Sequence, residues 1–342
     1  MKTVTTAKFI KANFIGLNLG FWLALCTPLA FSQEPAPEAA PATTLDEVLV
    51  EGEQPGPGLW RVSKGDHVLW ILGTHSPLPK KMSWRSAQVE SVIAESQAIL
   101  TNTSVNADIG FWKGLTLLPS IVGIRNNPDG AKLREVVPPD LYARWAVLKE
   151  KYIGRDNDPE KWRPIFAAQE LYSKAIQKSG LVMGGITWPI IEKTAKKHKV
   201  KITRPRIELE VDKPRALIKE FKKGELADVD CFAKTIERLE TDLDAMRARA
   251  NAWARGDIAA LRKISFVDHA SACNDAVMNA QVVRQHGYQD LPAQVQKEWV
   301  SAAEKALSEN HSTFAVLPIS ELLKSNGHLA ALRADGYEID EP

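Results

Sequence analysis

Residues 59–73, LWRVSKGDHVLWILG, decide the fold of this chain. Two apolar runs rich in β-branched and aromatic residues flank the polar tripeptide Lys64-Gly65-Asp66, a pattern that predicts two antiparallel strands joined by a tight turn. Gly73 ends the second run, and a glycine there lets the backbone turn sharply and lets a ligand approach closely. We therefore expect the folded part of the chain to open with a β-hairpin.

Apolar periodicity predicts the elements that follow the hairpin. Residues 84–96 have helical spacing and residues 98–100 form a short apolar run, so a helix and a buried strand come next. The middle is predicted to be mostly helical, with helices at residues 138–152, 162–178, 186–199, 228–255, 270–285 and 292–308 and strands at 200–202 and 207–211. The end is predicted as a strand at 313–317, a helix at 321–333 and a strand at 337–339. The predicted fold class is α/β, in which a strand core from the N- and C-terminal segments is surrounded by helices.

The N-terminal residues have the features of a targeting signal. Three lysines precede an apolar run at residues 14–25, and the small residues Ala30 and Ser32 follow it; residues 1–32 contain no acidic residue. This order predicts a secretory signal over residues 1–32, cleaved after Ser32, and a periplasmic or secreted protein. An uncleaved membrane anchor and a lipoprotein site at Cys26 are the alternatives, although the apolar run is short for a full span.

Domain boundaries follow from the composition after the signal. Residues 33–57 are rich in Pro, Ala and Glu and are predicted to be an extended linker. Residues 58–342 are predicted to form one folded domain, with no membrane span once the signal is removed. At 44% hydrophobic and 25% charged residues, the chain has the ordinary composition of a globular protein.

Charge and cysteine content limit the partners and the chemistry. The chain has 44 basic and 42 acidic residues, and removal of the signal leaves 41 and 42, so no basic field for nucleic acid is expected. Of the three cysteines, Cys26 leaves with the signal, while Cys231 and Cys273 remain in an oxidising compartment. The sequence leaves open whether these two form a disulfide or are buried free thiols.

The sequence lacks the common short catalytic motifs, and His75 is the one position that suggests a functional site. The sequence has no HExxH, GxSxG or P-loop motif. His75 follows Gly73 at the predicted carboxyl end of a strand, where the sites of α/β proteins gather. Taken alone, a histidine after a strand is more often a surface or capping residue.

The sequence resembles the TraB/GumN family, which includes the Tiki metallopeptidases. The resemblance runs from about Leu59 to Ile339 and rests on the order and spacing of short pieces. These pieces are Leu59-Trp60-Arg61-Val62, Trp70-Ile71-Leu72-Gly73-Thr74, Arg163-Pro164, Gly184-Gly185-Ile186, Ile207-Glu208-Leu209-Glu210, Ala252-Trp253-Ala254-Arg255-Gly256-Asp257, Phe314-Ala315-Val316 and Leu329-Ala330-Ala331-Leu332-Arg333-Ala334-Asp335-Gly336-Tyr337. The resemblance implies an extracytoplasmic α/β fold whose two halves build one cleft. In the best-known members that cleft binds a divalent metal and cleaves peptides.

The chain departs from the family at the positions that carry this chemistry. The family pattern has a G-x-x-H after the opening hairpin, a Glu at the end of the next strand and a second G-x-x-H after the late strand. Here Ser76 stands at the first histidine position with His75 one residue early, Asn102 replaces the Glu, and Glu321 stands at the second histidine position. Thr187 follows Gly184-Gly185-Ile186 where the family usually has Asp. Asn is a weak neutral ligand where a carboxylate is needed.

The sequence therefore predicts a non-catalytic, peptidase-like scaffold that binds a peptide or an envelope component and needs no cofactor. The expected ligand-binding residues are Gly73, Thr74, Ser76, Asn102, Thr187, Glu210 and Ser320. The alternative is a divalent-metal-dependent peptidase or hydrolase with a rearranged site, in which His75 and Glu321 are the metal ligands and catalytic residues and Glu210 completes the site. A third possibility is an accessory protein that binds a partner through a surface rich in its ten tryptophans.

Overall fold

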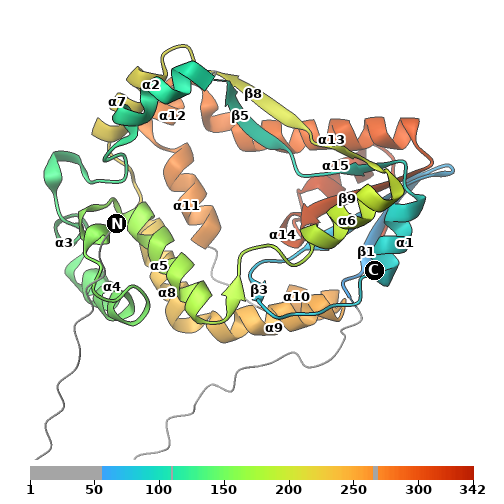
Figure 1. Cartoon of the computed structure of the whole chain (residues 1–342), viewed down its shortest axis with the longest axis horizontal. Coiled ribbons are helices and arrows are strands. Elements are labelled where there is room, and N and C mark those ends of the chain that lie inside the picture. Colours follow the sequence, from blue (N-terminus) through green and yellow to red (C-terminus); the bar gives the residue numbers. More distant parts are fainter. Residues whose placement is uncertain (1–55, 109–110, 265–268) are drawn as a thin grey trace, which may run out of the picture. The chain divides into compact units, whose positions relative to one another are not determined.

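The structure, a computed structural model, describes residues 56–342 except residues 109–110 and 265–268 (Figure 1). These residues belong to one unit, Val48–Pro342. The predicted signal at residues 1–32 and nearly all of the predicted linker at residues 33–57 lie outside the described residues. Within the described part of the chain, every helix is too short or too polar to cross a membrane.

A six-stranded mixed sheet forms the centre of the fold, in the order β10-β1-β2-β9-β4-β7. Its strands are β1 Leu59–Lys64, β2 His67–Thr74, β4 Ala98–Leu100, β7 Lys201–Thr203, β9 Ser312–Pro318 and β10 Glu338–Asp340. Strands β2, β9, β4 and β7 are mutually parallel, and β1 is antiparallel to both of its neighbours. The predicted α/β class is confirmed, and so is the strand core built from both ends of the chain.

The local sequence explains the two central strands. Gly65 has φ +63°, the left-handed conformation that the tight turn between β1 and β2 requires. Strand β2 then pairs with β9 from Val68↔Ser312 to Thr74↔Pro318. Both strands are almost continuously apolar because helices cover both faces of this part of the sheet.

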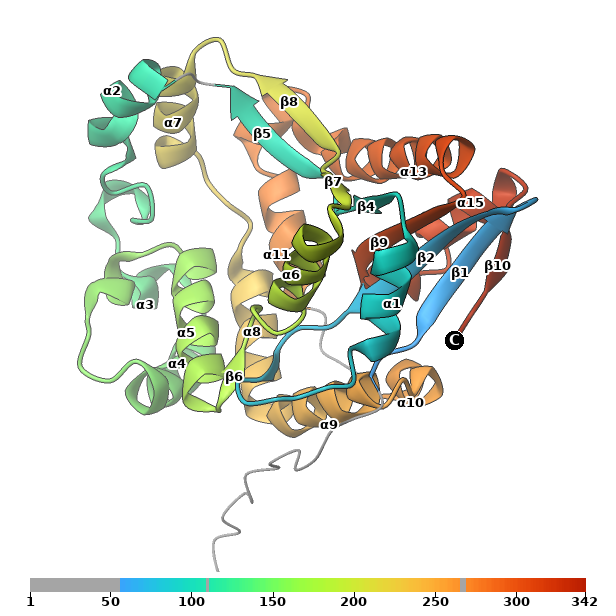
Figure 2. The same cartoon turned by 45° about the vertical axis from the view of Figure 1, so that its right-hand side comes forward.

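Helices lie on both faces of the sheet (Figure 2). Helices α1 Ala87–Glu95 and α6 Trp188–His198 pack together on one face, and α13 Leu291–Glu309 and α15 His328–Ala334 pack together on the other. From β2 to β4 and β7 the chain advances toward one edge of the sheet, and from β7 to β9 it returns, so connections of the same hand place their helices on opposite faces. One apolar core, which includes Trp60, Phe314 and Trp299, joins these layers.

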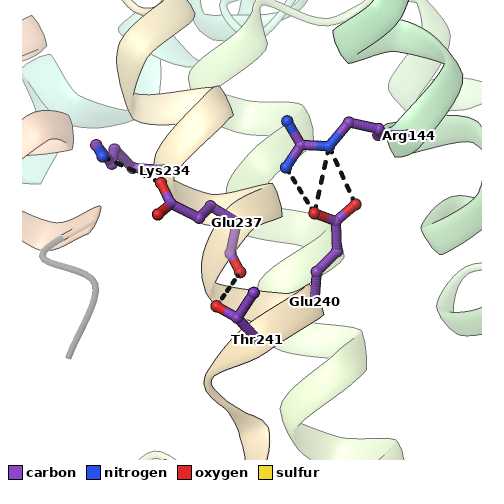
Figure 3. Close-up of polar contacts among 5 residues, drawn as sticks. All are labelled: Arg144, Lys234, Glu237, Glu240 and Thr241. Carbon is purple, nitrogen blue, oxygen red and sulfur yellow. Dashed lines mark hydrogen bonds and ion pairs between the residues drawn. The ribbon is translucent and has the colours of Figure 1, made fainter. Parts of the chain in front are cut away.

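A second apolar core lies among the middle helices. It involves α3 Leu133–Val136, α4 Pro139–Tyr152, α5 Pro164–Lys178, α8 Val229–Thr241 and Met246 of α9 Leu243–Ala254. At its surface the Arg144 guanidinium on α4 donates to both carboxylate oxygens of Glu240 on α8, at 2.5–3.2 Å (Figure 3). A disulfide between Cys231 and Cys273 joins α8 to α11 His269–Met278, which decides between the two alternatives left by the sequence.

Three predicted helices are each divided in two. The helix expected at residues 228–255 separates into α8 and α9 at Asp242, a buried carboxylate that pairs with arginines on both helices. The helix expected at 321–333 separates into α14 Ile319–Leu322 and α15, because Ser325-Asn326-Gly327 favours a turn. Residues 270–285 separate into α11 and α12 Gln281–Gln285.

The remaining elements are short or peripheral. Strands β5 Ser104–Asp108 and β8 Arg206–Glu210 form a parallel pair outside the six-stranded sheet. The others are β3 Leu78–Pro79, α2 Phe111–Ile121, the 3-10 turn Pro128–Gly130, the 3-10 turn Asp158–Lys161, β6 Leu181–Val182, α7 Pro214–Lys223, α10 Ile258–Lys263 and the 3-10 turn Tyr288–Asp290. Among β5, β8 and these other elements, the sequence predicted only β8.

Candidate functional site

The carboxyl ends of β2, β9, β4 and β7 meet at one edge of the sheet, which we call the carboxyl edge. Most of the predicted site residues follow these strand ends. His75 comes directly after β2, Asn102 lies two residues beyond β4, and Ser320 lies two residues beyond β9. The parallel pairing therefore gathers segments that are far apart in the sequence, as expected for an α/β fold.

Gly73 is required by packing. The Trp253 indole N–H donates a hydrogen bond of 2.6 Å to the Gly73 carbonyl oxygen. A Cβ atom at Gly73 would lie 2.8 Å from a ring carbon of Trp60 and 3.0 Å from Ile319. The next residue, Thr74, donates its hydroxyl to the Leu317 carbonyl at 3.2 Å. The glycine thus allows close approach by core side chains, whereas the sequence suggested close approach by a ligand.

His75 is half-buried and lies near positive charge. Its Nε2 is buried and makes no hydrogen bond within the described part of the chain. The pKa of His75 is lowered to about 4. Burial is the largest cause, and the positive charges of Arg249 and Arg238 act in the same direction. The imidazole is therefore neutral near pH 7 and could serve as a hydrogen-bonding group.

A buried charge cluster on α8 and α9 produces this environment, and we call it the Asp242 cluster. The Asp242 carboxylate pairs with the Nε atom of Arg238 at 3.4 Å and with the guanidinium of Arg249. All three residues are less than a tenth exposed. The Arg238 guanidinium also lies 5.5 Å from the ring centre of Tyr172 on α5. Two arginines against one aspartate leave the cluster with net positive charge.

Sequence reasoning missed the Asp242 cluster. Arg238 and Asp242 are four residues apart, the spacing that places two side chains on one face of a helix. Arg249 follows seven residues later, on the same apolar stripe as Leu239 and Met246. Charged residues on an otherwise buried stripe were the signal that could have revealed the cluster.

Glu321 contacts the turn that follows α14 and the start of α15. Its carboxylate accepts a hydrogen bond from Lys324 at 2.7 Å and lies 3.9 Å from Nδ1 of His328. Burial lowers the pKa of His328. The neighbouring Ser320 is exposed. Glu321 is therefore already engaged locally by a lysine.

The proposed third ligand, Glu210, lies in the separate β5–β8 pair, where it is exposed and aligned with Asp108. Among the described residues, His75, Glu321 and Glu210 do not form a group whose ligand atoms all lie within 4.8 Å of one another. The positive charges that lower the pKa of His75 would also oppose a divalent cation at its Nε2. These residues do not fit the metal that the family pattern implies.

Ser76 connects two of the predicted segments. Its hydroxyl donates to the Met183 carbonyl at 2.6 Å, which joins the loop after β2 to the loop containing Gly184 and Gly185. Thr187 lies half-buried at the start of α6, just after that loop. Asn102 is exposed after β4. The arrangement thus presents polar side chains at the carboxyl edge.

The tryptophans mostly belong to the core. Eight of the ten are described, and five of these are buried: Trp60, Trp84, Trp145, Trp253 and Trp299. The other three, Trp70, Trp162 and Trp188, are half-buried. The described residues therefore offer no exposed tryptophan surface for a partner.

A cavity of about 740 Å³ lies between α7 and residues 120–129. Four basic residues line it: Arg215, Lys219, Lys222 and Lys223. Lys222 donates to the Val122 carbonyl at 2.7 Å. None of the predicted site residues lines this cavity, so it is separate from the carboxyl edge.

Comparison with known proteins gives one clear result. A family model described as "TraB/PrgY/gumN family" matches residues 58–341, which is most of the chain. No curated protein and no solved structure has a significant match.

Proposed function

Since the chain belongs to the TraB/PrgY/gumN family, we propose that it is an exported, non-catalytic, peptidase-like protein that binds a peptide or an envelope component at the carboxyl edge. The observation that carries this proposal is the environment of His75. An imidazole whose pKa is lowered by burial and by Arg249 and Arg238 favours a neutral or anionic group beside it over a divalent cation.

The side chains at the carboxyl edge suit hydrogen bonding to a peptide. Asn102 offers an amide with both a donor and an acceptor, Thr187 offers a hydroxyl group, and Ser76, whose hydroxyl donates to Met183, offers an acceptor oxygen. Peptide backbones present the same two kinds of group in alternation, so neutral polar side chains can bind them without a metal. The positive charge of the Asp242 cluster would favour peptides with acidic side chains or a free carboxyl terminus.

Two features support export. The lysines, apolar run and small residues at positions 1–32 match a secretory signal. The disulfide between Cys231 and Cys273 would persist in an oxidising compartment such as the periplasm.

The test measures peptide binding and peptide cleavage together. A pool of fluorescein-labelled peptides is mixed with the purified exported protein; fluorescence polarisation reports binding, and mass spectrometry reports cleavage with added Zn²⁺, Mn²⁺ or Co²⁺. We expect binding without cleavage. Asn102→Trp should weaken binding at least tenfold, while Ser91→Trp, an equally bulky change at an exposed position on α1, should leave it unchanged.

The metal-dependent alternative makes the opposite prediction. If the chain is a peptidase or hydrolase that uses His75 and Glu321, added metal should produce cleavage that His75→Ala and Glu321→Ala abolish. That result would refute the non-catalytic proposal. Absence of binding across the peptide pool would refute its peptide-binding part.

A further inference from the structure

Two histidines and an aspartate meet at the opposite edge of the same sheet. Asp66 lies in the turn between β1 and β2, His67 is the first residue of β2, and His311 directly precedes β9. The Val68 N–H donates to the His311 carbonyl at 2.9 Å. The pairing of the two parallel strands therefore fixes the backbone of both histidines side by side.

The three side chains converge on one point. The Asp66 Oδ1 atom lies 3.6 Å from His67 Nε2, and its Oδ2 atom lies 3.3 Å from His311 Nδ1. The two imidazole centres are 4.9 Å apart. Within the described residues, no other set of three or more His, Cys, Asp or Glu residues brings its ligand atoms within 4.8 Å of one another.

We propose that Asp66, His67 and His311 form a binding site for a transition-metal ion, with Zn²⁺ as the ion of best fit. Zinc bonds of about 2.0–2.1 Å place tetrahedral ligand atoms roughly 3.3 Å apart. The two measured separations end on different oxygens of Asp66, and one ligand atom from each of the three residues lies within 4.8 Å of the other two. Rotation of the exposed Asp66 and His311 side chains can close these separations around the half-buried His67.

The ligand set determines which ions should bind. Imidazole nitrogen suits Zn²⁺, Cu²⁺ and Ni²⁺, whereas Mg²⁺ and Ca²⁺ prefer sets made entirely of oxygen. The side chains of Asp66 and His311 are 79% and 71% exposed, which gives an ion an open path from solvent. Three protein ligands leave a fourth position for water, as in open zinc sites.

This site is distinct from the carboxyl edge. Strand β2 separates His67 from His75, and eight residues of strand span roughly 25 Å. The metal site therefore does not depend on the proposed function, and substitutions at the two ends of β2 can be compared directly.

A plain ion-pair cluster without metal affinity is the competing interpretation. It predicts no saturable binding of Zn²⁺, whereas a metal site predicts one ion per chain and weaker binding when either histidine is replaced.

The experiment uses the purified, untagged, full exported chain after treatment with EDTA and desalting. Isothermal titration with ZnCl₂ at pH 7.5 should give one tight site, and CoCl₂ should give the visible absorption of four-coordinate Co²⁺. His311→Ala and His67→Ala should each weaken binding at least tenfold. Excess MgCl₂ or CaCl₂ should not compete.

Matched variants decide where any metal binds. His286→Ala removes another exposed histidine that lies beside a carboxylate, Glu220, and should leave binding unchanged. His75→Ala should also leave it unchanged. Wild-type affinity in both His311→Ala and His67→Ala would overturn this proposal. Loss of binding in His75→Ala instead would overturn both this site and the metal-free carboxyl edge. Circular dichroism of the metal-free variants controls for folding.

Discussion

The indole N–H of Trp253 and the carbonyl oxygen of Gly73, which are 180 residues apart in sequence, form a hydrogen bond of 2.6 Å. The bond fixes α9 against the end of β2, immediately before His75. Two of the sequence pieces that carry the family resemblance, one around each residue, are therefore direct contact partners.

Removing this hydrogen bond should destabilise the fold. Trp253→Phe keeps an aromatic ring but leaves the buried Gly73 carbonyl without its donor, which should lower the free energy of unfolding by about 1–3 kcal/mol, plus the loss of ring volume. Urea denaturation measures the change. Trp299→Phe is the matched control, because that buried indole N–H has no hydrogen-bond partner in the described structure. An equal loss in both variants would show that ring volume alone matters.

Gly73→Ala should also destabilise the protein, by roughly 1–3 kcal/mol. The new methyl group would lie 2.8 Å from Trp60 and 3.0 Å from Ile319, so core side chains would have to shift. Gly184→Ala provides the comparison, since its added Cβ meets nothing within 4 Å. Thermal unfolding of both variants tests the prediction, which fails if their melting temperatures agree.

The Asp242 cluster should be sensitive to loss of its single negative charge. Asp242→Asn leaves two buried arginines without a counter-charge and should cost about 3–5 kcal/mol. Asp244→Asn removes a carboxylate that is 70% exposed and pairs with Arg247, so it should cost less than about 1 kcal/mol. Equal effects in chemical denaturation would contradict the burial of the cluster.

Acid should destabilise the fold partly through His75. Its pKa is about 4 in the folded protein, whereas an unperturbed histidine, as in the unfolded chain, has a pKa of 6.5. Between these values the unfolded chain binds a proton that the folded chain does not. Stability should therefore fall as pH decreases from about 6.5 to about 4, by on the order of 3 kcal/mol for this residue.

His75→Gln should reduce this loss of stability in acid. The lowered pKa of His328 acts in the same direction but is common to both proteins. Urea denaturation at a series of pH values compares the variant with the wild type. Parallel pH–stability curves for the two proteins would rule out this role for His75.

Reduction of the disulfide should weaken the protein as well. Cys231 and Cys273 are 42 residues apart, and a loop of that length contributes about 4 kcal/mol in the chain-entropy account. The Cys231→Ala, Cys273→Ala double variant should therefore unfold at lower urea concentration, and dithiothreitol should shift the wild type but not the variant. An identical shift in both would mean that the reductant acts elsewhere.

Much of the fold could be predicted because its signals are local. The hairpin, the strand at 313–317 and the helices at 138–152 and 162–178 follow from apolar spacing, a turn glycine and prolines at helix starts, and all are present in the structure. The break at Asp242 could not be predicted in the same way. The apolar stripe continues through it, and the carboxylate finds its partners only when α8 and α9 pack together.

The candidate site was predictable in position but not in chemistry. A glycine and a histidine at a strand end indicated the carboxyl edge, and parallel pairing of β2, β9 and β4 brings the other predicted segments there. The positive environment of His75 comes from Arg238 and Arg249, which are more than 160 residues away in sequence. Neither residue has any local pattern that links it to His75.

The pairing of β2 with β9 also has a consequence for biosynthesis. The central strand β2 has no parallel neighbour until residues 312–318 have left the ribosome, long after β2 itself at His67–Thr74. Folds that depend on such distant pairings form slowly, because a long loop must close before the contact is gained. The six-stranded sheet would thus stay incomplete until β9 has been synthesised, and an incompletely folded chain is the state in which the proposed export would move it across a membrane.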